Sequence, residues 1–371
     1  MKYYVIAGEA SGDLHGANLI RALKKRDQEA EFRCWGGELI QEAAGTPLVE
    51  HYRNTAFMGF VEVVKNLRTI LQFIRACKED LVAYAPDVLI LIDYPGFNLR
   101  IADFAKKQGL RVFYYISPQI WAWNTGRVHK IKKMVDRMFV ILPFERDFYQ
   151  KWNVEVDFVG HPLLDAVEAD KAVETTDFYT QNGLEDKPIV ALLPGSRQQE
   201  IKRMLPIMLE MIAHFPTHQF VIAGASAMEE VFYQEFIGDS AVKMVKNQTY
   251  GLLRHAKAAL VTSGTATLET ALYKVPQVVC YKGNALSYQL GKRLVKVKYI
   301  SLVNLILDRG LVKELIQDDL HEETLKNELA LLLEEENYRA TLLEGYRELA
   351  DVLGGAGASG RVADLMVGYL L

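Results

Sequence analysis

Short, almost uninterrupted apolar runs that each end in a turn constrain this chain most strongly. The clearest is Asp87–Ile92 (DVLILI), which has no polar residue after its first position. A strand that is apolar on both faces is typical of a parallel sheet covered by helices on both sides. Lys2–Ala7, Arg111–Ile116 and Arg137–Leu142 repeat the pattern, and the segments between them have apolar residues at helical spacing. This alternation predicts an α/β fold with a parallel sheet.

A second series of the same kind begins at Pro188 with the strand Ile189–Leu193. Further strands are expected at Val156–Val159 in the first series and at Gln219–Ala223, Lys243–Val245, Ala258–Val261 and Gln277–Tyr281 in the second. Residues 165–187 are polar and irregular, and they predict a connector. The pattern predicts two doubly wound domains, residues 1–165 and 188–340, that face a cleft. Helices at 341–371 are expected either to return to the first domain or to exchange with a partner chain.

Composition excludes several classes of protein. The 371 residues are 50% hydrophobic and 24% charged, as in globular proteins of about two domains. A net charge of −4 argues against nucleic-acid binding. The cysteines Cys34, Cys77 and Cys280 form no C-x-x-C pair, so no disulfide framework is indicated and a reducing cytoplasm is expected. No apolar stretch reaches the roughly 18 residues of a membrane span, so any membrane contact is expected at the surface.

Metal and nucleophile motifs are missing from the sequence. It contains no D-x-D, no H-E-x-x-H and no G-x-S-x-G. Neither a metal nor another cofactor is therefore predicted.

The loop after the first strand, Gly8–Gly16 (GEASGDLHG), is the first candidate site, because ligands of open parallel sheets bind beyond the carboxyl ends of the strands. Its glycine spacing is not the G-x-G-x-x-G of dinucleotide binding. It is interpreted either as a tight turn that starts a helix, capped by Ser11 or Asp13, or as a ligand loop. In the second case Gly8 and Gly12 allow close approach of the ligand, and Asp13 and His15 face it.

Asp93 follows a fully apolar strand directly, in the loop IDYPGFN. A carboxylate beside low-dielectric packing has a raised pKa, which suits a general base. The alternative is that Asp93 only caps a helix that starts near Phe97, with Pro95 and Gly96 forming the turn.

A strand-to-helix loop in the second half, Pro194–Ile201 (PGSRQQEI), is a candidate anion site. Gly195 and Ser196 free backbone N–H groups at a helix start, and Arg197 adds a permanent cation. The alternative is a surface pair between Arg197 and Glu200.

Thr262–Glu269 (TSGTATLE) repeats this device. Ser263, Gly264 and Thr265 precede a helix whose positive end favours a diphosphate. Glu269 is placed either to accept from ribose hydroxyls or as an ordinary first-turn Glu. Two such loops in one half predict a nucleotide diphosphate as ligand.

Ser117–Lys133 combines two tryptophans with several cations, among them Arg127. This pattern fits a phosphate-bearing or interfacial ligand, or else a solvated helix face behind core tryptophans.

Phe57–Leu81 is the candidate membrane segment. It begins with apolar Phe57, Met58 and Phe60 beside cations, which fits shallow insertion at an anionic bilayer or an acyl-chain groove. Val61 opens an apolar stripe at helical spacing, whose alternative role is packing on the sheet. The stripe continues through Val64, Leu67, Leu71 and Ile74.

Eight motifs in one order carry a resemblance to a known family: GEASGDLHG, MGFVEV, IDYPGFN, SPQIWAWNTGRV, ILPFE, VGHPLLD, LLPGSRQQEI and SGTATLE. With KRLVKVKYISLVNLI at 292–306 and LVKEL at 311–315, they resemble the lipid-A-disaccharide synthase family over residues 3–315. The resemblance implies the GT-B fold of two Rossmann-like domains. It implies an inverting, metal-independent transferase, peripheral at the inner face of the cytoplasmic membrane of a Gram-negative bacterium.

The implied reaction joins UDP-2,3-diacylglucosamine to 2,3-diacylglucosamine 1-phosphate and releases UDP. By resemblance, Asp93 is the essential aspartate, Arg197 the essential arginine, and Asn304 and the helix of SGTATLE bind the nucleotide. Some family members have a second acid, in IDAPDFN, where this chain has Gly96. Asp93 is therefore the sole candidate base in its loop.

The candidate residues form three groups. The UDP-sugar is expected at Gly195, Ser196, Arg197, Ser263, Gly264, Thr265, Glu269 and Asn304. The acceptor is expected near Gly8, Ser11, Gly12, Asp13, His15 and Arg127, and acyl chains or the membrane at Phe57, Met58, Phe60 and Val61. The expected partners are the two lipid substrates and the anionic inner membrane, without nucleic acid, and a homodimer is left open.

Two other functions remain as alternatives. An enzyme like UDP-N-acetylglucosamine 2-epimerase would act on a soluble sugar nucleotide without an acceptor. A non-catalytic sugar-nucleotide or lipid-binding protein would show affinity without turnover. A nicotinamide dehydrogenase fits poorly, because the glycine spacing is wrong.

Overall fold

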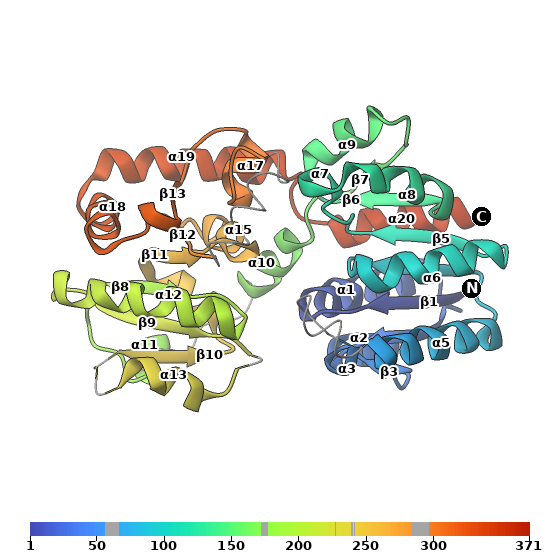
Figure 1. Cartoon of the computed structure of the whole chain (residues 1–371), viewed down its shortest axis with the longest axis horizontal. Coiled ribbons are helices and arrows are strands. Elements are labelled where there is room, and N and C mark those ends of the chain that lie inside the picture. Colours follow the sequence, from blue (N-terminus) through green and yellow to red (C-terminus); the bar gives the residue numbers. More distant parts are fainter. Residues whose placement is uncertain (56–66, 172–176, 227, 239, 241, 284–296) are drawn as a thin grey trace. The chain divides into compact units, whose positions relative to one another are not determined.

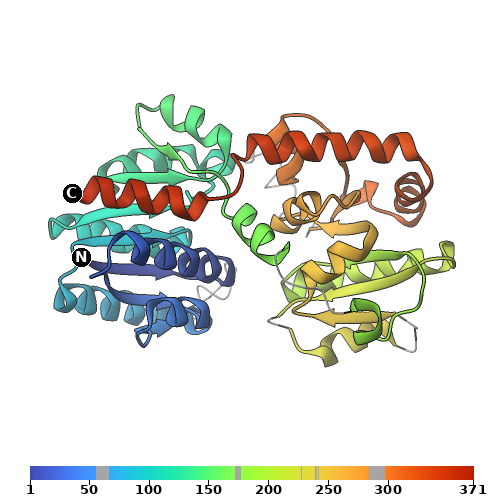
Figure 2. The same cartoon turned by 180° about the vertical axis from the view of Figure 1, so that it is seen from behind.

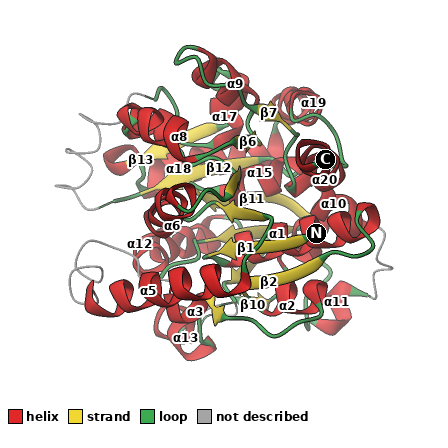
Figure 3. Ribbon diagram, turned by 90° about the vertical axis from the view of Figure 1, so that its right-hand side faces the viewer, coloured by secondary structure: helices red, strands yellow, loops and turns green. Residues whose placement is uncertain are grey.

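A computed structural model describes the chain except for residues 56–66, 172–176, 227, 239, 241 and 284–296. It falls into two compact units (Figure 1): unit 1 comprises Met1–Asp165 and Leu353–Leu371, and unit 2 comprises Ala166–Val352. Each unit contains one parallel sheet, and strands lie between helices (Figure 3). The predicted α/β class with two doubly wound sheets is confirmed.

The sheet of unit 1 has the order β3-β2-β1-β4-β5-β6-β7, so the chain order reverses between β1 and β4. Its strands are β1 (Lys2–Ala7), β2 (Glu31–Gly36), β3 (Glu50–His51), β4 (Val88–Ile92), β5 (Arg111–Tyr115), β6 (Arg137–Val140) and β7 (Asp157–Phe158). All five residues of β4 are buried, as its apolar sequence predicts.

Helices cover both faces of this sheet. They are α1 (Ala10–Arg26), α2 (Glu38–Ala44), α3 (Tyr52–Thr55), α5 (Leu67–Tyr84), α6 (Pro95–Lys107), α7 (Ile120–Trp123), the 3-10 turn η1 (Thr125–Arg127), α8 (Val128–Met134), α9 (Pro143–Gln150) and α20 (Ala358–Leu370). The C-terminal helix α20 lies beside α1 on one face (Figure 2), and α5, α6 and α8 lie on the other (Figure 1). Residues from the two ends of the chain therefore share one layer.

The sheet of unit 2 has the order β10-β9-β8-β11-β12-β13, with its reversal between β8 and β11. Its strands are β8 (Ile189–Leu193), β9 (Gln219–Gly224), β10 (Lys243–Lys246), β11 (Ala256–Thr262), β12 (Gln277–Tyr281) and β13 (Lys313–Ile316). The strands β8 and β12 have the predicted bounds.

The helices of unit 2 connect and cover these strands. They are α11 (Phe178–Gln181), α12 (Gln198–Glu210), η2 (Met211–His214), α13 (Glu230–Ile237), α14 (Thr249–His255), α15 (Thr265–Leu272), α17 (Leu302–Leu307), η3 (Gln317–Asp319), α18 (Glu322–Glu334) and α19 (Glu336–Val352). The helix α10 (Leu163–Lys171) contains the boundary between the units.

Several expected features differ from the structure. The expected connector, residues 165–187, contains most of α10 and all of α11, because apolar residues such as Val167 and Phe178 give these helices buried positions. The helices expected at 341–371 do not pack together in one domain. Helix α19 ends in unit 2 at Val352, and only α20 packs in unit 1. On α5, Ile74 is buried but Leu71 is 54% exposed, so the predicted stripe does not pack on the sheet as a whole.

Among the helices of the described residues, none is both long and apolar enough to cross a membrane.

Candidate active site

The predicted loops flank the two points where the strand order reverses. In unit 1, β1 and β4 are neighbours, so Gly8 and Asp93 follow adjacent strands. In unit 2, β8 and β11 are neighbours, which places the loop 194–197 beside the loop 263–265. Such reversal points are where open α/β sheets bind ligands. Each sheet therefore presents two of the predicted loops at its preferred binding position.

Asp93 lies just beyond the buried end of β4, and burial raises the pKa of its carboxyl group to about 7, with the nearby Glu9 carboxylate as the next cause. The predicted raised pKa is thus confirmed. Helix α6 begins at Pro95 and its N-cap is Tyr94, so Asp93 is not the residue that caps this helix. A carboxyl group that titrates near neutral pH is suited to accept a proton from a substrate hydroxyl.

The backbone around Asp93 is held in a strained conformation. Asp93 and Tyr94 both have left-handed backbones, with φ of 44° and 47°. The Asp93 carbonyl accepts hydrogen bonds from Asn98 Nδ2 at 2.8 Å and from the Tyr114 hydroxyl. The Asp93 N–H donates to the Tyr115 carbonyl at 3.1 Å. Strained residues that are held by their surroundings in this way gather at functional sites.

Gly8 allows a close approach, but the group that approaches belongs to the protein. A Cβ atom on Gly8 would lie 2.2 Å from the ring of Tyr94, which itself stacks on Phe97. The absence of a side chain therefore lets Tyr94 cover the start of α1. Gly12 has a similar structural role, since a Cβ there would lie 3.3 Å from that of Ala7 on β1.

Asp13 is not a loop group, which corrects the expectation for Gly8–Gly16. Helix α1 begins at Ala10, after the N-cap Glu9, and Ser11 is exposed in its first turn. The Asp13 carboxylate is 3% exposed and accepts from three N–H groups at the start of α2. These donors are Gly37 N at 2.7 Å, Leu39 N at 3.1 Å and Ile40 N at 3.0 Å. Asp13 therefore joins α1 to α2, and its contact with a ligand stays a prediction.

His15 is also buried within unit 1 and not in a loop. Burial lowers the pKa of His15 to about 4, against the opposing effect of the Asp165 carboxylate, and burial together with the nearby His15 ring lowers the pKa of His161 to about 3. Both rings are therefore neutral at neutral pH. Within the described part of the chain, no group hydrogen-bonds to His15 Nδ1.

Arg127 lies in η1, half-buried, on the segment that follows β5. Burial and the Asp93 carboxylate raise the pKa of the Tyr114 hydroxyl, and the Arg127 guanidinium opposes them. Arg127 and Asp93 thus both act on the same buried hydroxyl. The cations Lys132 and Lys133 are exposed on α8, as expected for a solvated face.

Glu145 ends the motif ILPFE, but no role was predicted for it from the sequence. Its carboxylate is 1% exposed, and burial raises its pKa to about 7. It accepts from the N–H groups of Ile141 and Leu142 at 3.3 and 3.0 Å and from Trp121 Nε1 at 3.3 Å. Two sequence signals point to it: it ends the motif ILPFE, and it lies three residues after the N-cap Leu142, where Glu can close a capping box.

In unit 2, the loop after β8 holds an internal carboxylate. Gly195 has a φ of 113°, which favours glycine, and the N–H groups of Ser196 and Arg197 donate to Glu200 Oε2 at 3.1 and 3.3 Å. Arg197 is 58% exposed and lies 3.4 Å from Glu200 Oε1. The surface pair that the sequence left as an alternative is therefore present. A diphosphate at these N–H groups would compete with the Glu200 carboxylate.

The loop after β11 leads into α15 through exposed Gly264 and Thr265. The Ser263 hydroxyl is already used, since it donates to the Ile300 carbonyl at 2.8 Å. Burial raises the pKa of the Glu269 carboxyl group, which accepts from the Tyr250 hydroxyl at 3.1 Å. The exposed start of α15 remains suited to an anion.

Asn304 is hydrogen-bonded through its amide group inside unit 2. It is 1% exposed, donates to the Val312 carbonyl and Glu314 Oε1 at 2.9 Å each, and accepts from Val312 N at 2.9 Å. Asn304 therefore positions the chain that leads into β13, and its contact with the nucleotide stays a prediction.

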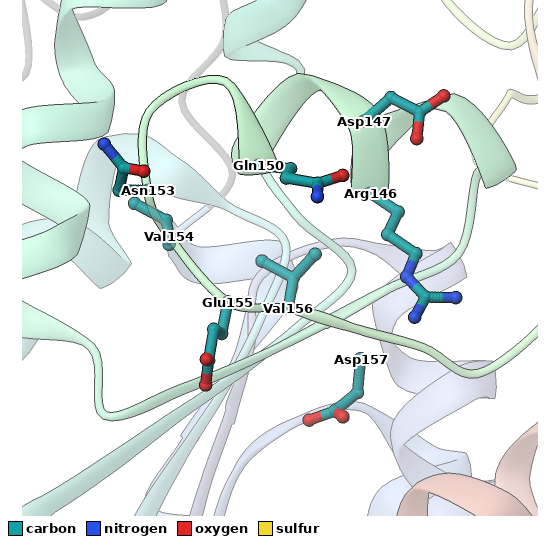
Figure 4. Close-up of a pocket in the computed structure, with 8 residues that line it drawn as sticks. All are labelled: Arg146, Asp147, Gln150, Asn153, Val154, Glu155, Val156 and Asp157. Atoms are coloured by element: carbon teal, nitrogen blue, oxygen red, sulfur yellow. The ribbon is translucent and has the colours of Figure 1, made fainter.

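A pocket of about 740 Å³ in unit 1 involves none of the predicted site residues. It lies between α9 and the segment that leads into the edge strand β7 (Figure 4). Its charged lining is of mixed sign: Arg146, Asp147, Glu155 and Asp157. Ligand pockets are mostly lined by apolar groups with a few polar ones, so this charged groove does not resemble the predicted substrate site.

Phe57, Met58, Phe60 and Val61 lie outside the described residues, so the predicted membrane segment stays a prediction. Across the described ranges, no three His, Cys, Asp or Glu side chains gather where they could hold a metal ion.

Solved structures resemble the chain in fold. A UDP-GlcNAc 2-epimerase from Neisseria meningitidis bound to UDP-GlcNAc matches with a TM-score of 0.69 at 14% identity, covering 100% of this chain and 99% of that one. The S. aureus MnaA–UDP co-structure matches with a TM-score of 0.72 at 12% identity, covering 100% and 96%. The calicheamicin glycosyltransferase CalG4 gives 0.59 at 17% identity, with 100% and 98% covered. At such low identity these matches show the fold alone.

Sequence comparisons are more specific. The family model described as lipid-A-disaccharide synthetase matches residues 3–352. A lipid-A-disaccharide synthase from Syntrophus aciditrophicus is 42% identical over 367 residues, covering 97% of this chain and 95% of the relative. One from Coxiella burnetii is 39% identical over 367 residues, covering 98% and 96%. The chain belongs to the lipid-A-disaccharide synthase family, and it is a glycosyltransferase with the GT-B fold.

Proposed function

We propose that the chain transfers the sugar of UDP-2,3-diacylglucosamine to 2,3-diacylglucosamine 1-phosphate (lipid X). The products are the β-1′,6-linked lipid A disaccharide 1-phosphate and UDP. The observation that carries the proposal is the family match over residues 3–352, which includes the loops at both strand-order reversals. The Asp93 carboxyl group, whose pKa is about 7, supports it with a suitable base.

Unit 2 is the proposed site of the UDP group. Arg197 offers an exposed guanidinium, and the start of α15 at Thr265 offers N–H groups with the positive end of the helix dipole. Glu269, with its raised pKa, is proposed to face the ribose. Glu200 leaves the N–H groups of Ser196 and Arg197 when the diphosphate binds there.

Unit 1 is the proposed site of the acceptor. Asp93 takes the proton of the acceptor's 6-hydroxyl as that oxygen attacks the anomeric carbon in line. The bond from this carbon to the diphosphate oxygen breaks, and its electron pair leaves with UDP. Arg197 and the N–H groups stabilise the charge on the departing diphosphate. The mechanism uses no metal, and attack from the face opposite the leaving group inverts the anomeric configuration.

Arg127 is the proposed contact of the acceptor phosphate, supported by its position on the segment beyond β5 and near Tyr114. Phe57, Met58, Phe60 and Val61 are proposed to meet the acyl chains at the inner face of the cytoplasmic membrane. This placement agrees with the substrates' two acyl chains, which keep them in the lipid layer.

The test is a mixed-micelle assay with both lipid substrates, in the presence of EDTA. We expect disaccharide and UDP from the wild type, and a rate at least ~10²-fold lower for Asp93→Asn, as for loss of a general base. Asp103→Asn is the matched control, because Asp103 lies on the same helix α6 but forms an exposed pair with Lys107. Arg127→Ala should raise the KM for the acceptor and leave that for the donor unchanged.

Three results would contradict the proposal. Product that disappears with EDTA would exclude the metal-independent mechanism. Full activity of Asp93→Asn would exclude Asp93 as the base. No disaccharide from the wild type, but conversion of soluble UDP-N-acetylglucosamine without an acceptor, would indicate an epimerase.

A further inference from the structure

Two residues of α9, one helical turn apart, hold the segment that follows β5. Glu145 Oε1 accepts from Trp121 Nε1 at 3.3 Å, and the Tyr149 hydroxyl lies 2.7 Å from Ser117 Oγ. All four side chains belong to unit 1, and Glu145, Tyr149 and Ser117 are 1%, 0% and 4% exposed. The rings of Trp121 and Phe144 add an edge contact at 4.8 Å between their centroids. Helix α9 therefore contacts this segment at two separate points.

The groups around the Glu145 carboxylate are all donors. Oε2 accepts from the N–H groups of Ile141 and Leu142, and Oε1 accepts from the indole of Trp121. The carboxylate thus serves as the shared acceptor between the start of α9 and α7. A buried donor that loses its acceptor is left without a hydrogen bond and away from water, which is unfavourable in free energy. Breaking any of these hydrogen bonds should therefore destabilise this part of unit 1.

The segment that these contacts hold is strained at its start. Ile116 has a φ of 63°, a left-handed conformation that is unfavourable for a β-branched residue. Its N–H donates to the Phe139 carbonyl of β6 at 3.0 Å. Such a conformation persists only where the surroundings determine it, and Ser117, the next residue, is the one that Tyr149 contacts.

The strained segment follows β5, which pairs with β4, so it lies next to the loop that holds Asp93. It ends in η1 with Arg127, whose guanidinium acts on the buried Tyr114 hydroxyl. Tyr114 in turn donates to the Asp93 carbonyl. The position of Arg127 relative to Asp93 therefore depends on the path of residues 116–127.

We propose that Glu145 is a positioning residue, which together with Tyr149 holds residues 116–127 in the conformation that places Arg127 for the acceptor's phosphate. This inference rests on the proposed transferase function, in which Arg127 contacts that phosphate. Glu145 touches neither substrate, so its effect reaches the reaction through Trp121 and the segment.

Glu145→Gln is the most informative variant. The amide oxygen of Gln can replace one carboxylate oxygen toward Ile141 and Leu142, but its NH₂ group then faces the indole N–H of Trp121, donor against donor. Trp121→Phe removes the same hydrogen bond from the other side. Because both changes break one contact, their effects on the acceptor's KM should not add in the double variant.

Kinetics with the lipid substrates form the first readout. For Glu145→Gln we expect the KM of the acceptor to rise about tenfold, the scale of one lost hydrogen bond to a buried charge, with the donor's KM unchanged. Tyr149→Phe, a smaller change, should act in the same direction. Asp80→Asn is the matched control for general loss of stability. It removes a carboxylate that binds Arg33 and Tyr4 elsewhere in unit 1.

Hydrogen–deuterium exchange of the full chain without substrates forms the second readout. Backbone amides of residues 116–127 should exchange faster in Glu145→Gln than in the wild type or in Asp80→Asn. Unchanged exchange in this segment, or an unchanged acceptor KM beside faster exchange, would overturn the inference. A wild type that forms no disaccharide would refute the proposed function instead, and exchange alone would then decide whether Glu145 holds the segment.

Discussion

At the scale of single residues, the clearest property of this chain is that the ionised carboxylate of Asp93, just after a buried strand, lowers the stability of the folded state. The pKa of Asp93 is about 7, against an ordinary value of 3.8. The folded state therefore binds an extra proton between these values, and the unfolded state does not. Stability from this group is fully present below 3.8 and is lost as the pH rises through about 7.

Asp93→Asn should therefore stabilise the protein while it abolishes transfer. At pH 8 we expect the free energy of unfolding in urea to rise by up to about 4 kcal/mol, because the pKa of Asp93 is about three units above its ordinary value, and at pH 5 by roughly 1.6 kcal/mol. Asn also tolerates the left-handed backbone at this position. A gain of equal size at both pH values would show that the charge of Asp93 is not the cause.

Gly96 can accept the second acid that some family members have. A Cβ on Gly96 meets no heavy atom within 4 Å, and the residue lies in the exposed first turn of α6. Gly96→Asp should stabilise the protein by about 1 kcal/mol, from the helix dipole and the loss of glycine's flexibility. In activity measurements, the added negative charge should move the acidic limb of the pH profile upward, since it raises the pKa of Asp93 further.

The control for this prediction is Gly96→Asn, which has nearly the same shape without the charge. It should give part of the gain in stability predicted for Gly96→Asp and should leave the acidic limb of the activity–pH profile unchanged. An equal pH shift in both variants would exclude the electrostatic explanation.

The sequence predicted the residues whose role depends on near neighbours. Asp93 was predictable because it directly follows an apolar strand, and the loop around Arg197 because a glycine and a cation precede a helix. Glu145 was not, because its partner Trp121 is 24 residues away. The internal hydrogen bonds of Asp13 and Asn304 were not predictable either, because polar residues in a motif do not show which groups of the fold will meet them. Their contact with a ligand stays a prediction.

At the scale of elements, the strands that were predicted also differ from those that were not in how much their sequence pattern reveals. β1, β8 and β12 were predicted to the residue, because each is a compact apolar run. Three strands were not expected: the edge strands β3 and β13, and β2, which lies next to an edge and has the charged residues Glu31 and Arg33. The edge strands β7 and β10 were expected, but with bounds that differ by one residue or more. The chain's apolar periodicity therefore reveals the centre of each sheet better than its margins.

The docking of α20 depends on one carboxylate. Asp165 Oδ1 accepts from Ala358 N at 3.2 Å and from Gly357 N, and Oδ2 accepts from Ser359 N at 2.8 Å. These are donors of the helix's first turn, which has no partners within the helix. Asp165→Ala should lower the free energy of unfolding by about 1–2 kcal/mol, as for loss of a helix cap.

Exchange measurements should localise this effect. Amides of residues 357–370 should exchange faster in Asp165→Ala. Asp364→Asn is the control on the same helix, because it breaks only an exposed pair with Arg26 and should change stability by less than about 0.5 kcal/mol. Faster exchange in both variants alike would contradict the special role of Asp165.

At the scale of the whole molecule, each unit has its own core. One hydrophobic cluster includes Tyr4, Leu91 and Val140 of unit 1, and another includes Ala191, Val221 and Val261 of unit 2. The sequence predicted this division from the second series of strands. It left open whether the final helices return to unit 1 or exchange with a partner chain, because helical periodicity alone does not tell which sheet a helix covers. The chain returns to unit 1 at Leu353, and α20 packs there on α1.

Separate cores allow the binding sites to be assigned to units by calorimetry. If UDP binds to unit 2, it should raise the unfolding temperature of that unit's transition, by the equivalent of about 2.7 kcal/mol at a UDP concentration one hundred times the Kd. The transition of unit 1 should stay in place. In Arg197→Ala, whose guanidinium is the proposed diphosphate contact, the shift at the same UDP concentration should be much smaller. Asp93→Asn, which changes unit 1, should keep the full shift. A shift that Asp93→Asn removes and Arg197→Ala keeps would place the nucleotide on the wrong sheet and reverse the proposed roles of the two units.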